Sequence, residues 1–303
     1  MYKKTMTEYH CLSTQRNLIT FTNFENIDLS ICNIYLADLL QTLLKDFSIL
    51  LDTYFNNYNI NFTIRCNEYN WSCCISITST RKKTHSNTIP NEALESIHSK
   101  YTTLPCCYLA INKKIIINNK FQDLFGIVYN PLSFRQPDDS IRNYIINYFT
   151  NVFTSRSCVY SCFIGGECTL YGKLTDTIHS KYFFTDFESI YNDLLDNYTK
   201  CLDKDLGTIK LIDYDKYSFP WLDIFPSGCD NTILIANTSF HGLGKNLSSE
   251  ITNSQCLEIY IVSCNWKSFL ADFEILQSKY SIEKVTELFT CTNIFIIKLS
   301  STT

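Results

Sequence analysis

The sequence predicts an α/β protein in which a small α/β domain, residues 1–124, precedes a larger domain, residues 125–303, built on an open and mostly parallel sheet. Two observations support this prediction. After Phe125, short apolar segments alternate with helical stretches, which is the order expected of a parallel sheet with crossover helices. Before it, one long amphipathic segment is followed by shorter segments of alternating hydrophobicity.

The smaller domain begins with an amphipathic helix, because leucine and phenylalanine recur at helical spacing over residues 34–55. Residues 62–66 and 74–78 alternate between apolar and polar types on either side of a polar turn, and they predict a β-hairpin. We expect a short helix over residues 90–98, because Pro90 suits a first turn, and strand character over residues 108–117.

The larger domain contains five apolar strand candidates, at residues 158–164, 182–185, 208–212, 232–237 and 257–263. Helical patterns lie before, between or after them, at residues 140–153, 188–198 and 267–278. Residues 282–288 and 294–299 are close enough in the chain to pair antiparallel. The sequence therefore predicts five parallel strands followed by a terminal hairpin.

The composition is that of a globular protein. Of the 303 residues 45% are hydrophobic and 18% are charged, and the formal net charge is −4. This charge argues against binding nucleic acid through bulk positive potential, so RNA binding must be argued from a site. The basic run of residues 81–83 is interpreted as a solvated loop. Abundant Asn, Ile, Tyr and Phe suit an AT-rich genome, such as that of a large DNA virus.

The 15 cysteines are interpreted as reduced thiols of a cytoplasmic protein, because no apolar signal segment follows Met1. The pairs Cys73–Cys74 and Cys106–Cys107 lack the spacing of a zinc site, and no group fits an iron–sulfur cluster. We therefore expect neither a metal nor an iron–sulfur cofactor. No segment approaches the ~18 apolar residues of a membrane span, so no membrane association is expected.

Glycine is scarce and clustered, with Gly165 and Gly166 directly after the first strand of the larger domain. The carboxyl ends of strands are where open α/β sheets bind nucleotides. A tight turn and the close approach of a ligand both favour glycine, and both interpretations stay open. Asp186 ends the second strand, about 20 residues further on, where a carboxylate can accept hydrogen bonds from ribose hydroxyls. Alone, it is equally explained as a helix N-cap.

The order of these segments resembles the family of S-adenosylmethionine-dependent tRNA and rRNA uracil-C5 methyltransferases, whose class I sheet is assembled from five parallel strands and a terminal hairpin. The matching segments are residues 133–136 (SFRQ, similar to the family's SFFQ), 164–167 (IGGE, at its glycine loop), 237–243 (NTSFHGL, where it has DPPR-x-GL) and 263–269 (SCNWKSF, like SCNP-x-T), followed by Asp272. The resemblance runs from residue 133 to the end of the chain.

The resemblance implies covalent chemistry. In the family a cysteine thiolate adds to C6 of uracil so that C5 becomes nucleophilic, and a carboxylate later removes the C5 proton. Cys264 corresponds to that cysteine, although a buried structural thiol is the alternative. The resemblance also implies S-adenosylmethionine as cofactor and RNA as partner. The expected cofactor-binding residues are Gln136 at the methionine end, Gly165, Gly166 and Glu167 in the loop, Asp186 at the ribose and Asn237 near the substrate base.

The chain also departs from the family pattern. Ser161 replaces an acidic residue, Glu167 a loop glycine, Asn237 the DPPR aspartate and Phe240 its arginine. The family's final histidine and glutamate, the latter its general base, should fall in residues 292–297, where the sequence contains no carboxylate. Either another acid, such as Asp272 or Glu287, substitutes, or the domain no longer turns over.

Three functional hypotheses follow. The first is an RNA methyltransferase that uses Cys264 on a pyrimidine. The second is a pseudoenzyme, a binding or scaffold protein that has kept the fold, which the lost aspartate, arginine and glutamate favour. The third is methyl transfer to another acceptor by a non-covalent route, because Asn237-Thr238-Ser239 loosely resembles motifs that position acceptor amines in other methyltransferases. The oligomeric state stays open.

Overall fold

The computed structural model describes residues 6–11, 18–22, 32, 34–50, 58–66, 71–79, 91–101, 107–111, 114–123, 125–136, 139–155, 160–175, 180–198, 207–212, 232–254, 256–289 and 293–302. The chain forms two compact units. The first consists of Met1–Ser13 together with Phe134–Thr303, and the second of Thr14–Ser133. The expectations for residues 51–55, 81–83 and Cys106 lie outside the described residues.

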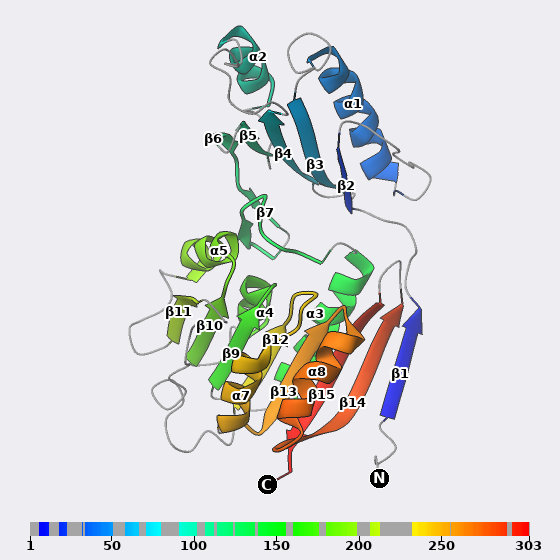
Figure 1. The fold of residues 1–303 in the computed structure, drawn as a ribbon, viewed down its shortest axis with the longest axis vertical. Helices are drawn as coiled ribbons and strands as arrows, with labels where there is room; N and C mark the ends of the chain where they lie inside the picture. The colour runs from blue at the N-terminus through cyan, green and yellow to red at the C-terminus, as the bar shows by residue number, and fades with distance from the viewer. Residues whose placement is uncertain are drawn as a thin grey trace. The chain divides into compact units, whose positions relative to one another are not determined.

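The Thr14–Ser133 unit is built on a five-stranded sheet of order β2-β3-β4-β5-β6 (Figure 1). All its neighbouring pairs are antiparallel except β4 with β5. The strands are β2 Leu18–Thr22, β3 Tyr58–Cys66, β4 Trp71–Ser79, β5 Cys107–Ile111 and β6 Lys114–Asn118, and the helices are α1 Ile34–Leu50 and α2 Asn91–Tyr101. A two-stranded ladder of β7 Phe121–Gln122 and β8 Val128–Tyr129 follows.

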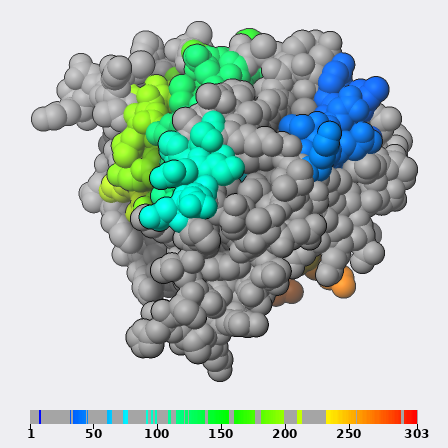
Figure 2. Space-filling model, turned by 90° about the horizontal axis from the view of Figure 1, so that it is seen from above, coloured from blue at the N-terminus to red at the C-terminus, as the bar shows by residue number. Residues whose placement is uncertain are grey.

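The expected hairpin is confirmed as β3 and β4, and the two expected helices are confirmed as α1 and α2. The segment 108–117 forms two antiparallel strands, β5 and β6. Period-two burial explains the hairpin, since Phe62 and Ile64 are fully buried whereas Asn61 and Thr63 are exposed. In Figure 2, α1 (blue) and α2 (cyan) are visible at the surface, so one side of each helix faces solvent.

The other unit contains an eight-stranded sheet of order β1-β14-β15-β13-β12-β9-β10-β11. The middle strands β13, β12, β9, β10 and β11 are parallel, β15 is antiparallel to both of its neighbours, and β1 is parallel to β14. The strands are β1 Met6–Cys11, β9 Tyr160–Gly165, β10 Ser180–Thr185, β11 Gly207–Leu211, β12 Thr232–Asn237, β13 Glu258–Ser263, β14 Tyr280–Phe289 and β15 Asn293–Ser301.

Helices cover both faces of this sheet (Figure 1). α7 Lys245–Asn253 and α8 Trp266–Leu276 pack on one face, while α3 Asp139–Thr154, α4 Cys168–Leu174 and α5 Glu188–Tyr198 pack on the other. The central strands are apolar throughout because both faces are covered; all six residues of β12 are buried, for example. The five predicted strands, three predicted helices and terminal hairpin are confirmed.

Three elements of this unit were not predicted. β1 has the mixed sequence MTEYHC, and it is recognisable as a strand only through its pairing with β14. α4 has seven residues and contains Gly172, so it has little helical periodicity of its own. α7 is short, and its polar residues outweigh the buried Leu247 and Ile251.

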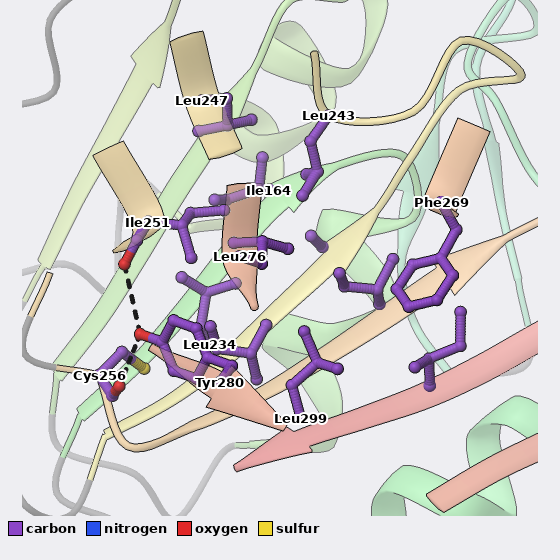
Figure 3. Packing of buried hydrophobic residues seen from close by; sticks show 14 of the residues in the cluster. Ile164, Leu234, Leu243, Leu247, Ile251, Cys256, Phe269, Leu276, Tyr280 and Leu299 are labelled. Carbon is purple, nitrogen blue, oxygen red and sulfur yellow. Dashed lines mark hydrogen bonds between the residues drawn. The ribbon is translucent and has the colours of Figure 1, made fainter. Parts of the chain in front are cut away.

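A buried tyrosine, Tyr280, packs in the core between the larger sheet and helices α7 and α8. Figure 3 shows Tyr280 among Leu234, Ile251 and Leu299, with its hydroxyl directed at two backbone carbonyls. The hydroxyl lies 2.8 Å from the carbonyl oxygen of Cys256 and 3.2 Å from that of Ile251. Burial raises the pKa of this phenol well above its usual value, so the hydroxyl is a donor at neutral pH.

We expect Tyr280→Phe to lower the free energy of unfolding by about 1 kcal/mol, because the substitution keeps the ring and removes only a buried hydrogen-bond donor. Urea unfolding of the intact chain, followed by far-ultraviolet circular dichroism, measures the difference. Tyr191→Phe on α5, a half-buried position, is the matched control and should change stability much less. Equal effects of the two substitutions would contradict this role of the Tyr280 hydroxyl.

Candidate functional site

The chain order of the strands creates a crevice at the carboxyl edge of the larger sheet. From β9 the chain proceeds outward to β10 and β11, and then returns to β12 on the other side of β9. The helices that follow β9 and β12 therefore leave in opposite directions at neighbouring strand ends, where Gly165 pairs with Asn237. Open α/β sheets bind ligands at such a topological switch point.

A pocket lies at this switch point and contains about 300 Å³ of empty space, part of it open to solvent. Apolar side chains and strand-end backbone form most of its wall, and Asp186 is its one charged lining residue. The lining residues are Ile164, Gly165, Asp186, Phe187, Asn237, Thr238, Ser239, Gly242, Leu243 and Leu247. Ile164, Leu243 and Leu247 also belong to the core cluster drawn in Figure 3, so the pocket adjoins packed core.

The glycine pair is explained in part by contacts within the chain. Gly165 has φ 85°, and a Cβ there would collide with the carbonyl oxygen of Asn237. A Cβ on Gly166 would come within 2.7 Å of the Phe134 ring, and the Gly166 amide donates to the same Asn237 carbonyl at 3.0 Å. The turn after β9 thus packs against the end of β12 at Gly165 and against the Phe134 ring at Gly166, which favours both glycines even without a ligand.

Glu167 continues this turn in an unusual way. It has φ 58°, the only positive φ at a non-glycine residue among the described residues, and it is 2% exposed. Its Oε1 accepts a hydrogen bond from the backbone amide of Gln136 at 2.7 Å and lies 3.6 Å from Arg142 Nε. Gln136 is also buried. The structure therefore brings together the predicted residues Gln136 and Glu167 next to the glycine pair.

Asp186 and Asn237 lie on the pocket wall but differ in exposure. Asp186 is exposed just beyond β10, so its carboxylate is accessible to a ligand. Asn237 is buried at the end of β12, and its Nδ2 donates to the Tyr171 hydroxyl at 3.2 Å. Burial raises the pKa of Tyr171 far above its usual value, and the nearby Glu167 carboxylate contributes to the shift. The Asn237 side chain is thus engaged in a hydrogen bond within the protein.

Cys264 is exposed immediately after β13. It lies at the same edge as the pocket, because Asn237 pairs with Val262 and the Thr238 amide donates to the Val262 carbonyl at 3.0 Å. Partial burial raises the pKa of its thiol, and a backbone hydrogen bond opposes the shift. The thiol is therefore accessible but mostly protonated at neutral pH.

The residues after Cys264 anchor the loop that follows β12. Asn265 caps α8, and its Oδ1 accepts from the amides of Lys267 and Ser268. Asn265 Nδ2 and Ser268 Oγ both donate to the backbone carbonyl of Phe240, at 2.9 and 2.8 Å. Hydrogen bonds therefore hold the segment that carries the Cys264 thiol against the loop of residues 239–244.

Asp272 also holds this loop in place through hydrogen bonds. Its Oδ2 accepts from the Leu243 amide at 2.7 Å, and its Oδ1 accepts from the Gly244 amide at 3.0 Å and from Ser248 Oγ at 3.4 Å. Burial raises its pKa, and these hydrogen bonds oppose the shift. Because both oxygens are engaged, Asp272 holds the loop in place and is not available as a base for a substrate.

Core residues occupy positions 294–297, within the segment where the family resemblance would place a general base. Ile294, Ile296 and Ile297 are buried in β15, and Phe295 is 9% exposed. Glu287, the other acid considered, lies on β14, which β15 separates from β13, and it accepts a hydrogen bond from Asn293 Nδ2 at 3.3 Å. Neither acid is placed beside Cys264 as a free carboxylate.

Sequence reasoning missed several residues of the site. Phe187 directly follows Asp186, and Leu243 and Leu247 have the four-residue spacing of one helix face, so these had a weak signal. Arg142 and Tyr171 had none, because only the fold brings Arg142 to the turn after β9 and the Tyr171 hydroxyl to Asn237. Over the parts of the chain that the structure describes, no His, Cys, Asp and Glu side chains group as a metal site, and none of the helices is long and apolar enough to cross a membrane.

Comparison with known proteins supports the fold. No protein-family model matches the chain, and no curated protein matches it in sequence. The tRNA (uracil-54, C5)-methyltransferase of Pyrococcus abyssi, solved with S-adenosyl-L-homocysteine, superposes with a TM-score of 0.60 at 14% identity over 96% of this chain and 78% of that chain. The chain has the class I methyltransferase fold. The structures it resembles are S-adenosylmethionine-dependent methyltransferases.

Two further class I methyltransferases match over about half of the chain. The N-methyltransferase NodS from Bradyrhizobium japonicum WM9, in complex with S-adenosyl-L-homocysteine, has a TM-score of 0.41 at 6% identity and covers 54% of this chain and 87% of its own. Magnesium protoporphyrin IX methyltransferase from Synechocystis PCC 6803, with bound S-adenosylmethionine, has a TM-score of 0.41 at 11% identity and covers 53% and 80%.

We expect Asp272→Asn to loosen the loop of residues 239–244, because it replaces a charged acceptor of two backbone amides with a neutral group that has one acceptor oxygen. Hydrogen bonds to charged groups contribute about 1.5–3 kcal/mol, so hydrogen exchange at the Leu243 and Gly244 amides should accelerate on the order of 10-fold or more. Glu274→Gln, an exposed change on the same helix, is the control. Unchanged exchange at both amides in Asp272→Asn would contradict the assignment.

Proposed function

We propose that this chain binds S-adenosylmethionine at the switch-point pocket and methylates C5 of a uracil in RNA, with Cys264 as the covalent nucleophile. The observation that carries the proposal is the exposed thiol of Cys264 at the same edge of the class I methyltransferase sheet as the pocket. The similarity to a tRNA uracil-C5 methyltransferase over 96% of the chain supports the same substrate class.

The residues of the pocket fit this cofactor. Asp186 is an exposed acceptor for ribose hydroxyls at the end of β10, and Phe187, Leu243 and Leu247 offer apolar surface for the adenine ring. None of the lining residues carries a positive charge, which suits a ligand with a cationic sulfur. When bound, S-adenosylmethionine supplies an electrophilic methyl group on that sulfur.

The proposed role of Cys264 follows from the chemistry of uracil, whose C5 is a poor nucleophile. Addition of the Cys264 thiolate to C6 moves the electron pair of the C5=C6 double bond onto C5, which can then take the methyl group. Loss of the C5 proton and departure of the thiolate restore the double bond. Because partial burial raises the pKa of the thiol, a base or a nearby positive charge must favour the thiolate.

The site is least suited to the last step, the removal of the C5 proton. Asp272 is engaged by the loop, and residues 294–297 are core. Water is then the base that removes the C5 proton, and we propose that turnover is slow while the covalent adduct is long-lived.

Phe240 is the proposed contact for the substrate base. Its side chain is 64% exposed, although its carbonyl is held by Asn265 and Ser268, the residues that follow Cys264. A large aromatic ring on a fixed backbone beside a nucleophile offers a stacking surface for an unpaired base, and stacking of this kind contributes about 1–3 kcal/mol. Phe240 takes the place of the arginine in the family motif, so the proposed contact is stacking rather than charge.

Covalent trapping tests the function. RNA containing 5-fluorouracil should give a denaturation-stable adduct with the wild-type chain and cofactor, because fluorine at C5 cannot leave as a proton does. Cys264→Ala should give no adduct, whereas the control Cys74→Ala, at a partly buried cysteine of the other unit, should. Adduct formation should accelerate as pH rises above neutrality, since the raised pKa of Cys264 leaves little thiolate below it. Failure with several RNAs, despite cofactor binding, would refute the covalent mechanism.

Phe240→Ala should weaken RNA binding and slow adduct formation on the order of 10-fold, while the affinity for S-adenosylhomocysteine stays unchanged. Fluorescence anisotropy with a labelled single-stranded RNA measures the first effect. Phe240→Tyr should retain most of the binding because it keeps the ring. Leu257→Ala, at an exposed apolar residue next to the opposite end of β13, is the control. If Phe240→Ala and Leu257→Ala behave alike, the stacking contact is wrong.

A second candidate function is a class I fold that binds its ligand or a partner without turnover. The engagement of both Asp272 oxygens and the apolar β15 favour it specifically. Cofactor binding without adduct or methyl transfer would support this assignment. Methyl transfer that persists in Cys264→Ala would instead indicate a non-covalent route to another acceptor, with Asn237, Thr238 and Ser239 at the site.

A further inference from the structure

The Glu167 carboxylate is a buried charged group in which one oxygen has no hydrogen-bond partner. The side chain is 1% exposed, and Oε1 is matched by the Gln136 amide and by Arg142. Oε2 is buried and has no hydrogen-bond partner. An unsatisfied buried oxygen of a charged group destabilises the folded state, so a donor that meets Oε2 would stabilise the folded chain.

The backbone conformation of Glu167 destabilises the folded chain further. A side chain at φ 58° lies in the left-handed region, which glycine occupies without strain. The turn therefore combines two unfavourable features, a strained backbone and an unmatched buried oxygen, at a position where glycine would have neither. Such local strain is typical of ligand sites, where binding compensates for it.

Glu167 is not itself one of the residues that line the pocket, but short contacts connect it to two of them. Glu167 is two residues after Gly165, which lines the pocket. The Tyr171 hydroxyl lies close enough to the Glu167 carboxylate for that charge to raise its pKa. The same hydroxyl accepts a hydrogen bond from the side chain of Asn237, another lining residue. A ligand whose ribose lies at Asp186, just beyond β10, and whose 5′ substituent extends toward the ends of β9 and β12 would end near Glu167.

We propose that Glu167 Oε2 accepts a hydrogen bond from the ammonium group at the amino-acid end of the adenosyl ligand. This inference rests on the proposed cofactor site and adds a selectivity to it. Because the free group is a carboxylate oxygen, the site should favour ligands with a positively charged amine at this end. It should contribute nothing to ligands that carry only a carboxylate or end at the methylthio group.

Calorimetric titration with four ligands tests the selectivity. S-adenosylhomocysteine carries both charged groups, its decarboxylated analogue only the ammonium, its deaminated analogue only the carboxylate, and 5′-deoxy-5′-methylthioadenosine neither. We expect the two ammonium ligands to bind about 10- to 100-fold more tightly than the other two. Equal affinity for the decarboxylated and deaminated analogues would overturn the proposal while leaving the cofactor site intact.

Substitution then assigns the selectivity to Glu167. Glu167→Gln should weaken the ammonium ligands about 10- to 100-fold and leave methylthioadenosine unchanged. It should strengthen the carboxylate-only analogue, because Arg142 loses its partner; a merely structural role would weaken all four ligands together. Glu167→Gly relieves the backbone strain and should show the same loss of selectivity, and Glu274→Gln is the unaffected control.

The wild-type ligand series decides the question even if a variant does not fold. Asp186→Ala separates the two levels of the proposal, because it should weaken all four ligands alike through the ribose. If none of the four binds to the wild-type chain, the proposed cofactor site fails and this inference with it. If all four bind, lose affinity in Asp186→Ala and keep equal affinities for the wild type, only the role of Glu167 is wrong.

Discussion

The site depends on one backbone contact, between the turn after β9 and the end of β12. The Asn237 carbonyl accepts the Gly166 amide, and Gly165 packs against the same oxygen with no room for a side chain. This contact brings together the two strand ends between which the sheet changes direction. Both halves of the pocket wall, and the side chains of Glu167 and Asn237, take their positions from it.

A second constraint lies on the other side of the pocket, where α8 organises the loop after β12. Asp272 binds the Leu243 and Gly244 amides, while Asn265 and Ser268 bind the carbonyl of Phe240. Residues that resemble a catalytic motif in sequence thus act largely as structural anchors. Cys264 is the member of this segment whose side chain is exposed and chemically available.

The sequence was sufficient for those parts of the fold that local patterns encode. Five apolar strands, three amphipathic helices and the terminal hairpin were predicted because each has its own periodicity. The contacts that define the site could not be predicted in this way. Arg142 lies 25 residues before Glu167, and Tyr171 is 66 residues from Asn237. Because the family's glutamate is missing, the sequence left Asp272 or Glu287 as a substitute base, and only the hydrogen bonds of the two Asp272 oxygens show that it holds a loop.

The strand β1 has a consequence for how the chain can fold. It precedes the Thr14–Ser133 unit in the sequence, whereas its partner β14 follows that unit and most of the larger sheet. The pairing, reinforced by an ion pair between Glu8 and Lys284 at 2.8 Å, therefore closes a long loop that contains the Thr14–Ser133 unit and most of the larger sheet. Such long-range closure is slow. Until it occurs, β14 is an unpaired sheet edge open to other chains, so a folding molecule is most prone to self-association before β1 pairs with β14.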